Sequence, residues 1–327
     1  MGDPLAGSRA APAGQRRGIA ATLGAVTLWT CNDTCGKLAS EVFPTGEMMA
    51  VRGIFAIALA VGIVVYAGHG RTLLHGGKLF LRPMLLLRAG LDAAVVLAFL
   101  KALAHMPLAN VTAISQTTPI IMTLIAAAFG LERIGWRRAL AILIGFSGVL
   151  LVVKPTADGL TIYAGLAILS AALVAVRDIL TRFIDPGIPS PIIALGTAVV
   201  GALSGLGLGL TEDWGPVLVP STLYLVLAGI LVTFGNLMIV VAYRAAEAGI
   251  LAPFRYFSIV MALILGYVVF KNLPDLISIL GIVLIIGSGV YTMHRERVRR
   301  LAAAQAETKA RPLTELTHET LPRDKAA

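Results

Sequence analysis

Charged residues are scarce in this chain of 327 residues: Asp, Glu, Lys and Arg make up 14% of it, against about 25% in soluble domains. Hydrophobic residues reach 57%, and the mean hydropathy is +0.85. This composition excludes a soluble globular domain. It predicts an all-α membrane protein that crosses the bilayer several times, with the lipid bilayer as its first partner.

Cysteine is also scarce, because the chain has only Cys31 and Cys35, four positions apart in one apolar run. This excludes a disulfide framework and argues against a metal site. We expect neither a metal nor a cofactor.

Motifs of pumps and enzymes are missing as well. The sequence has no G-x4-G-K-S/T loop, which disfavours ATP-driven pumping by this chain alone. It also lacks the D-D-x-x-D and H-E-x-x-H motifs that would support a membrane-embedded acyl or prenyl transferase. We therefore predict that the chain is not an enzyme and keep such a transferase as a remote alternative. A channel is disfavoured because the buried charges are scattered over the helices.

Ten apolar runs approach the roughly 20 residues needed to cross a bilayer. They cover residues 18–40, 46–66, 84–105, 108–129, 138–153, 160–183, 189–210, 220–244, 249–270 and 276–294. Residues 1–17 form an N-terminal tail, and residues 295–327 form a basic tail that we expect to be disordered. The first run contains Asp33 and Lys37, so an uncleaved span is favoured over a signal peptide.

The runs form two related halves, residues 18–155 and 156–294. Residues 141–149, AILIGFSGV, match residues 282–290, IVLIIGSGV, at an offset of 141. Each half has five runs, and five is odd, so the second half enters the membrane from the opposite side. The predicted fold is ten transmembrane helices in two inverted five-helix repeats, an architecture that many secondary transporters use.

The net charge of +9 does not indicate a nucleic-acid partner. Most Lys and Arg residues lie in the two tails and in the short segments between apolar runs, where they determine topology. With ten spans these segments fall on the side of both termini, and the opposite side holds only Lys154 and Lys271. We therefore predict cytoplasmic termini.

Charged residues inside the runs are costly, at about 2.5 to 3.5 kcal/mol each, and must be paired or functional. The motif from Asn32 to Lys37 recurs 145 positions later, beginning at Arg177. Side chains four positions apart lie on one helix face, which predicts three local pairs. These are Asp33 with Lys37, Arg88 with Asp92, and Asp178 with Arg182. Glycines at 201, 205 and 209 predict a small-residue packing face on one helix.

These motifs resemble the EamA branch of the drug/metabolite transporter superfamily. The resemblance covers about residues 18 to 297 and includes Asn32-Asp33…Lys37, Gly46-Glu47…Arg52, residues 87–90 (LRAG), residues 102–109 (ALAHMPLA), residues 252–256 (APFRY) and Pro274-Asp275…Gly281…Gly289-Val290-Tyr291. Within the family the chain is most similar to bacterial carriers for S-adenosylmethionine and riboflavin uptake. It departs from the family pattern at Ala141, where a glycine is usual. The resemblance implies a secondary transporter of the bacterial inner membrane.

Six polar residues are candidates for substrate contact. Arg255 and Tyr256 rank first because Pro253 loosens the helix there and the guanidinium can donate to or stack on a ring. The alternative is that Arg255 only pairs with Asp178 or Asp33. The other candidates are Ser115, Gln116, Asn32 and Asn236, and the alternative for Gln116 is a hydrogen bond between helices. Asp33 is a candidate proton carrier, and the alternative is a structural pair with Lys37.

The substrate is expected to be a small molecule. Away from the ends of the runs lie three acids and six cations, which favours a neutral ring such as riboflavin, or an anion, over cationic S-adenosylmethionine. The aromatic residues between 254 and 257 favour a ring as well. Riboflavin uptake is thus our first hypothesis. Uptake of S-adenosylmethionine and export of an amino-acid-like metabolite or drug stay open, as do the coupling ion and a homodimer.

Overall fold

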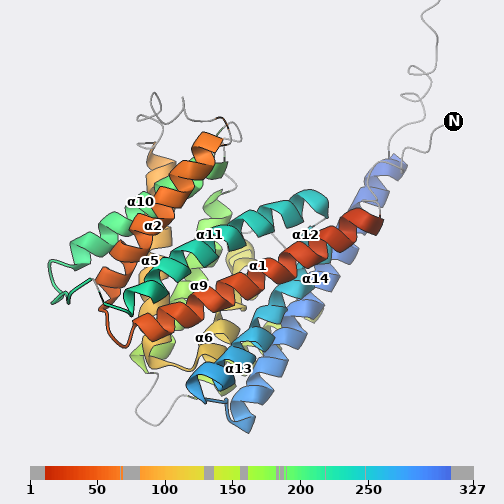
Figure 1. Cartoon of the computed structure of the whole chain (residues 1–327). Helices are drawn as coiled ribbons and strands as arrows, with labels where there is room; N and C mark the ends of the chain where they lie inside the picture. Colours follow the sequence, from red (N-terminus) through yellow and green to blue (C-terminus); the bar gives the residue numbers. More distant parts are fainter. Residues whose placement is uncertain are drawn as a thin grey trace, which may run out of the picture.

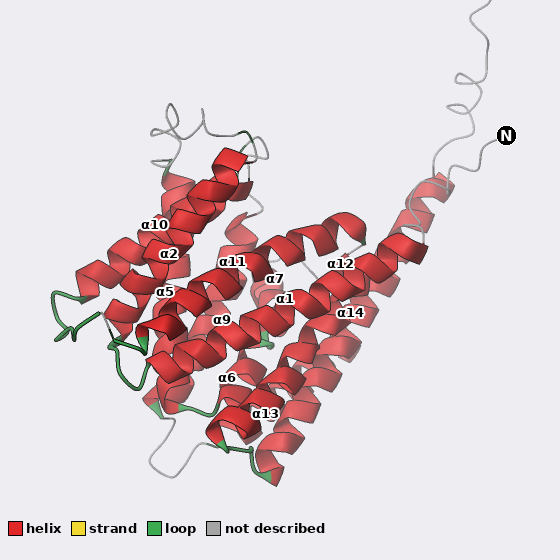
Figure 2. Cartoon of the chain, viewed as in Figure 1, coloured by secondary structure: helices red, strands yellow, loops and turns green. Residues whose placement is uncertain are grey.

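The computed structural model describes residues 12–66, 68, 82–128, 136–154, 161–181, 184, 188, 190–217, 219–246 and 248–310. Within these ranges every regular element is a helix (Figure 2). The predicted all-α class is therefore confirmed. Arg182 and several other cations on which the predicted topology depends, such as Arg9, Arg71 and Lys78, lie outside the described residues.

Helices coincide with all ten predicted runs (Figure 1). The first half holds α1 (Pro12–Ala39), α2 (Thr45–Tyr66), α5 (Pro83–His105), α6 (Leu108–Ser115), α7 (Thr118–Ala128) and α8 (Trp136–Val153). The second half holds α9 (Ile162–Thr181), α10 (Ser190–Leu208), α11 (Thr222–Ala245), α12 (Ala248–Leu251), the 3-10 helix η1 (Ala252–Tyr256), α13 (Phe257–Phe270) and α14 (Leu276–Ala310). Helix α14 continues beyond the predicted end of the tenth run at residue 294, so the expected disorder of the tail is wrong for residues 295–310, which are helical.

Among the described residues, seven helical segments are long and apolar enough to cross a membrane. They are Thr45–Tyr66, Pro83–His105, Leu108–Ile125, Ile162–Thr181, Thr222–Tyr243, Pro253–Phe270 and Leu276–Arg295. Two further apolar helices, Ala139–Val153 and Ile192–Leu208, are shorter. Helix α1 carries Asp33 and Lys37 and is not among the seven. The chain therefore has the helices of a multi-pass membrane protein.

The most extensive helix contacts join the two halves of the chain. Helix α1 packs along α11, and its counterpart α9 packs along α5. Helix α2 packs on its own counterpart α10, and α8 packs on its counterpart α14. If each helix is replaced by its counterpart in the other half, the α1–α11 pair becomes the α9–α5 pair, and the α2–α10 and α8–α14 pairs stay the same. This symmetry is expected for two copies of one unit.

Small residues allow the closest of these contacts. A Cβ at Gly205 would lie 2.5 Å from the backbone nitrogen of Ala50, so α10 and α2 touch backbone to backbone there. Gly148 and Gly281 bring α8 and α14 together in the same way. A Cβ at Gly201 would have nothing within 4 Å, so Gly201 does not belong to the predicted packing face.

The fourth predicted run is broken between α6 and α7, at Gln116 and Thr117. Pro119 has no N–H to donate to the carbonyl of Ser115, four positions earlier. The hydroxyl of Thr118 replaces that donor and lies 2.7 Å from the Ser115 oxygen. The main-chain oxygen that the break leaves without an N–H donor is therefore hydrogen-bonded by a side chain of the same segment.

The ninth run is interrupted at a matching place. Helix α12 passes into η1, with Pro253 in its first turn, before α13 begins at Phe257. Residues 120–124 (IIMTL) and 259–263 (IVMAL) follow the two breaks in sequence, at an offset of 139. At this offset Gln116 corresponds to Arg255. Both halves thus carry a broken helix at equivalent positions.

Candidate functional site

A cavity of about 160 Å³ lies where the two broken helices face α1 and α5. Helix α1 contributes Val26, Trp29, Thr30 and Asp33, and α5 contributes Phe99. The first break contributes Thr112, Ser115 and Gln116, and the second contributes Arg255 and Ser258. Both halves of the chain therefore line one cavity.

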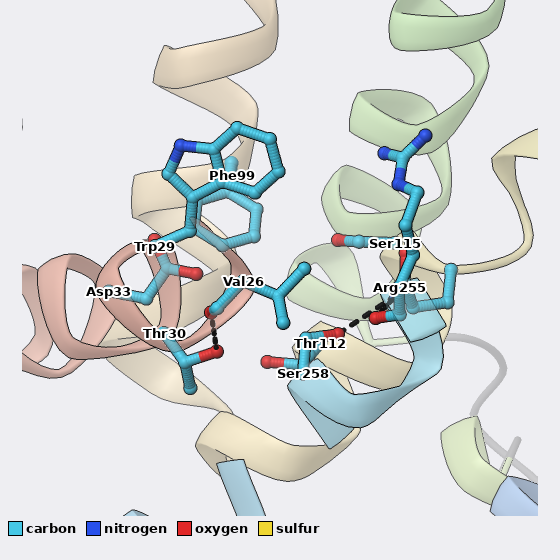
Figure 3. A pocket seen from close by; sticks show the side chains of 10 residues that line it. Val26, Trp29, Thr30, Asp33, Phe99, Thr112, Ser115, Arg255 and Ser258 are labelled. Carbon is cyan, nitrogen blue, oxygen red and sulfur yellow. Dashed lines mark hydrogen bonds between the residues drawn. The ribbon is translucent and has the colours of Figure 1, made fainter. Parts of the chain in front are cut away.

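The cavity has chemically different sides (Figure 3). Trp29, Phe99 and Asp33 lie on one side, and Ser115 and Arg255 lie on the other. Asp33 is the only acid that lines the described cavity, and Arg255 is the only cation. A ligand there would meet flat aromatic faces, hydroxyl groups and one charge of each sign.

The side chain of Gln116 ties the two helix breaks together. Its amide nitrogen donates to the main-chain oxygen of Arg255 at 2.6 Å and to the hydroxyl of Ser258 at 2.8 Å. Gln116 was predicted as a substrate residue, and it does line the cavity together with Ser115. Its amide donors, however, are already occupied by protein groups, so only its oxygen is free to accept from a ligand.

Arg255 is exposed, and within the described part of the chain its guanidinium has no recorded hydrogen bond or ion pair. The alternative pairing with Asp178 is not formed, because Asp178 binds Arg177. Asp33 lies on the opposite side of the cavity from Arg255 (Figure 3). The guanidinium is therefore available to a ligand.

Tyr256, predicted beside Arg255 as a second contact, is directed elsewhere. It is buried, and its hydroxyl lies 3.5 Å from the main-chain oxygen of Gln116. The ring packs so closely on α14 that a side chain at Gly289 would overlap it. Tyr256 therefore does not line the cavity, and the flat faces come from Trp29 and Phe99 in place of the segment 254–257.

The two predicted asparagines also act indirectly. The Asn32 amide donates to Asp33 at 2.9 Å, and its oxygen lies 3.5 Å from the guanidinium of Arg52. Asn236, on α11, accepts a hydrogen bond of 3.1 Å from the indole nitrogen of Trp29. Neither asparagine lines the described cavity, but each contacts a residue that does.

The predicted pair between Asp33 and Lys37 is not formed. The Lys37 ammonium donates to the main-chain oxygens of Leu103 and Met106, both at 2.7 Å. These carbonyls lie at the C-terminal end of α5, where the last helical oxygens have no N–H donors from their own helix. Lys37 therefore caps α5 and does not pair with Asp33, which lines the cavity.

The predicted pair between Arg88 and Asp92 is replaced in a similar way. Arg177 bridges two acids, Asp92 on α5 and Asp178 beside it on α9. Arg88 instead donates to the hydroxyls of Thr181 and Thr197, at 3.0 and 2.7 Å. The local spacing is compatible with the predicted pair, but a cation from the neighbouring helix reaches both acids at once.

The comparison with protein families gives two matches along the chain. The EamA-like transporter family matches residues 16–154 and again residues 161–293. The chain belongs to this family. Together with the apolar helices, membership identifies a multi-pass membrane protein of a transporter family.

Several curated members of the family are similar to the chain. A riboflavin transporter of Brucella anthropi is 31% identical over 255 residues, which are 74% of this chain and 86% of the relative. The pseudopaline exporter CntI of Pseudomonas aeruginosa is 29% identical over 260 residues, 76% of this chain and 86% of the relative. An S-adenosylmethionine uptake transporter of Rickettsia conorii is 26% identical over 274 residues, 82% and 89% of the two chains. These relatives differ in substrate and in direction of transport.

A solved crystal structure has the same fold. It aligns with a TM-score of 0.56 at 20% sequence identity and covers 88% of this chain and 99% of its own. The similarity therefore extends over both halves.

Trp29, Phe99 and Thr112 line the cavity and were not predicted from the sequence. Trp29 and Phe99 are aromatic residues in apolar helices, where the sequence alone does not distinguish a residue that faces lipid from one that faces a cavity. The repeated IIMTL and IVMAL segments place Gln116 opposite Arg255, two residues that the sequence predicts, and give no signal for Trp29, Phe99 or Thr112. The described residues contain no group of three His, Cys, Asp or Glu side chains that could hold a metal.

Proposed function

We propose that this chain is a secondary transporter that moves a small metabolite across the bacterial inner membrane by alternating access. The observation that carries the proposal is the cavity at two broken helices, one from each half. Broken helices at a repeat interface are typical of transporter substrate sites, because their free backbone groups and polar side chains can face a ligand inside the membrane.

The proposed topology is ten membrane-spanning helices in two inverted repeats with cytoplasmic termini. It is supported by the helix pairs, which are unchanged when the halves are exchanged. It is also supported by Figure 1, in which the start of α1 and the end of α14 lie at the same end of the molecule. An even number of spans is required for that arrangement.

Riboflavin is the first substrate that we propose. Trp29 and Phe99 offer faces for a ring, and the hydroxyls and the Gln116 oxygen offer hydrogen bonds to its polar edge. The riboflavin transporter that is 31% identical supports this choice. The cavity, at about 160 Å³, is below the roughly 300 to 1,000 Å³ of pockets for drug-sized ligands, so it must widen to hold a whole flavin.

A second candidate is a substrate that carries an amino acid group, such as S-adenosylmethionine. The charge count within the runs argued against it, but Lys37, Arg88 and Arg177 are all engaged by protein groups. In the cavity, one acid faces one cation. Asp33 is suited to an ammonium group and Arg255 to a carboxylate. An exported amino-acid-like metabolite would fit the same pair.

Uptake by a bacterial strain that cannot make riboflavin tests the proposal. We expect the intact chain to support growth on limiting riboflavin, and Arg255→Ala to abolish it at equal membrane expression. Arg17→Ala, an exposed cation at the other end of α1, is the matched control and should behave as the intact chain does. Accumulation of labelled S-adenosylmethionine without riboflavin-dependent growth would replace the first candidate by the second.

A further inference from the structure

One aromatic wall of the cavity is positioned from outside by helix α11. The indole nitrogen of Trp29 donates to the side-chain oxygen of Asn236 at 3.1 Å. Directly beside Asn236, a Cβ at Gly235 would lie 2.8 Å from both Cδ1 and Nε1 of the indole. The indole therefore rests on the backbone of α11 and is hydrogen-bonded to the same helix.

This arrangement fixes the orientation of a residue that lines the cavity. A tryptophan side chain has two rotatable bonds, and the hydrogen bond and the close backbone contact hold both. Holding the ring in place before a ligand arrives removes an ordering cost from binding. Packing α1 against α11 would not by itself require a hydrogen-bonded tryptophan at this position, since small residues bring these helices together elsewhere, as at Gly18, where an added Cβ would lie 3.2 Å from the Ala242 oxygen.

Thr112 provides a second, independent observation. Thr112 is 6% exposed and lines the cavity, and its hydroxyl oxygen is buried with no hydrogen-bond partner in the described part of the chain. A buried hydroxyl without a partner costs free energy, and a ligand atom that bonds to it recovers that cost. A polar group at the edge of a bound ring is such an atom.

We propose that Trp29 is the platform on which a planar, conjugated heterocycle of the substrate stacks, that Thr112 bonds to the edge of this ring, and that Asn236 and Gly235 are positioning residues for Trp29. The inference rests on the proposed transport through this cavity, and it deepens that proposal by naming the substrate class. Flavins and purines both belong to the class. Asn236, which the sequence predicted as a direct contact, acts through Trp29.

The fluorescence of Trp29 gives a test of binding that does not depend on transport. The chain has three tryptophans, and Trp136→Phe with Trp214→Phe leaves only Trp29. In this purified protein we expect saturable quenching of the Trp29 emission on titration with riboflavin or with S-adenosylmethionine. Trp29→Leu should weaken binding, measured by calorimetry, by about 5- to 150-fold, the range for stacking of a base on an aromatic side chain. Thr112→Val should weaken it as well.

Kinetics separate positioning from general damage. Asn236→Leu and Gly235→Ala should raise the KM of uptake with little change in kcat, and Asn236→Gln, which keeps an acceptor oxygen, should restore much of the loss. Gly165→Ala is the matched glycine control, because nothing lies within 4 Å of its added Cβ. Uptake without any response of Trp29, and with an unchanged KM in Asn236→Leu, would overturn the inference and leave the transport function standing. Quenching without uptake would support the binding site and overturn the proposed transport.

Discussion

Gln116 donates its side-chain amide to the main-chain oxygen of Arg255, at 2.6 Å and across 139 positions of sequence. The two residues occupy equivalent places in the repeat, each at the break of a helix. One therefore contributes its side chain to the contact, and the other contributes its backbone. Arg255 keeps its guanidinium free for the cavity, so the two residues should respond differently to substitution.

Replacing Gln116 by Leu should lower stability. The change removes hydrogen bonds to two partners, the Arg255 oxygen and the Ser258 hydroxyl. Interhelical hydrogen bonds in membranes contribute about 0.6 to 1.7 kcal/mol, so we expect a loss of about 1 to 3 kcal/mol. Thermal unfolding in detergent would measure it. Ser258→Ala, which removes one of the two bonds, should give a smaller loss, and equal unfolding temperatures for all three proteins would contradict the role of Gln116.

Replacing Arg255 by Ala should affect transport and leave stability nearly unchanged. The main-chain oxygen that Gln116 uses is retained, and the lost guanidinium has no recorded partner among the described residues. A lost charge-assisted hydrogen bond to a ligand is worth about 1.5 to 3 kcal/mol, or about 10- to 150-fold in KM. Arg255→Lys should recover part of the loss. A drop in unfolding temperature as large as that of Gln116→Leu would instead indicate a structural role.

Replacing Arg177 by Leu should destabilise the protein more than replacing the whole charge cluster. The single change leaves Asp92 and Asp178 half-buried beside each other without their shared cation. We expect a loss of about 2 to 4 kcal/mol, because an uncompensated buried charge is costly. Adding Asp92→Leu and Asp178→Asn should recover part of this loss in the same unfolding measurement. Additive losses in the triple variant would show that the cluster is not coupled.

Replacing Gly205 by Ala should separate α10 from α2. Its Cβ would lie 2.5 Å from the Ala50 nitrogen and 2.7 Å from the Gly46 oxygen, and backbone atoms cannot move aside easily. Overpacking of this kind costs about 1 to 3 kcal/mol. Gly201→Ala, one turn away on the same helix with nothing within 4 Å, is the control and should be neutral or slightly stabilising. Equal effects of the two substitutions would contradict the predicted contact.

The positions of the helices follow closely from the sequence because apolar length is a local property of the chain. At Pro253 the α-helix is interrupted by the 3-10 helix η1, because a missing N–H acts on its own turn; this turn is tighter than an α-helical turn and not looser, as the sequence had suggested. Charge partners were predicted less well. Spacing of four positions shows only which residues share a helix face. Lys37 donates to the main-chain oxygen of Leu103 and Arg177 binds Asp92, and both partners lie on another helix, α5.

The candidate site was predicted in part. Ser115, Gln116 and Arg255 line the cavity because polar residues in an apolar run stand out in the sequence. Trp29 and Phe99 do not stand out there, and their contribution depends on how α1, α5 and α11 pack. Asn236 is predicted as a substrate contact, but its partner lies 207 positions away, and only the tertiary structure identifies it.

The cross-pairing of the two halves also has a consequence for synthesis of the protein. Helices α1, α2 and α8 find their most extensive neighbours in α11, α10 and α14, all of which are made later. The first half of the chain is therefore synthesised before its partner helices, and its glycine-lined helix faces stay uncovered until the second half is made. The contact between α8 and α14 can form only after α14, the last helix, has been synthesised.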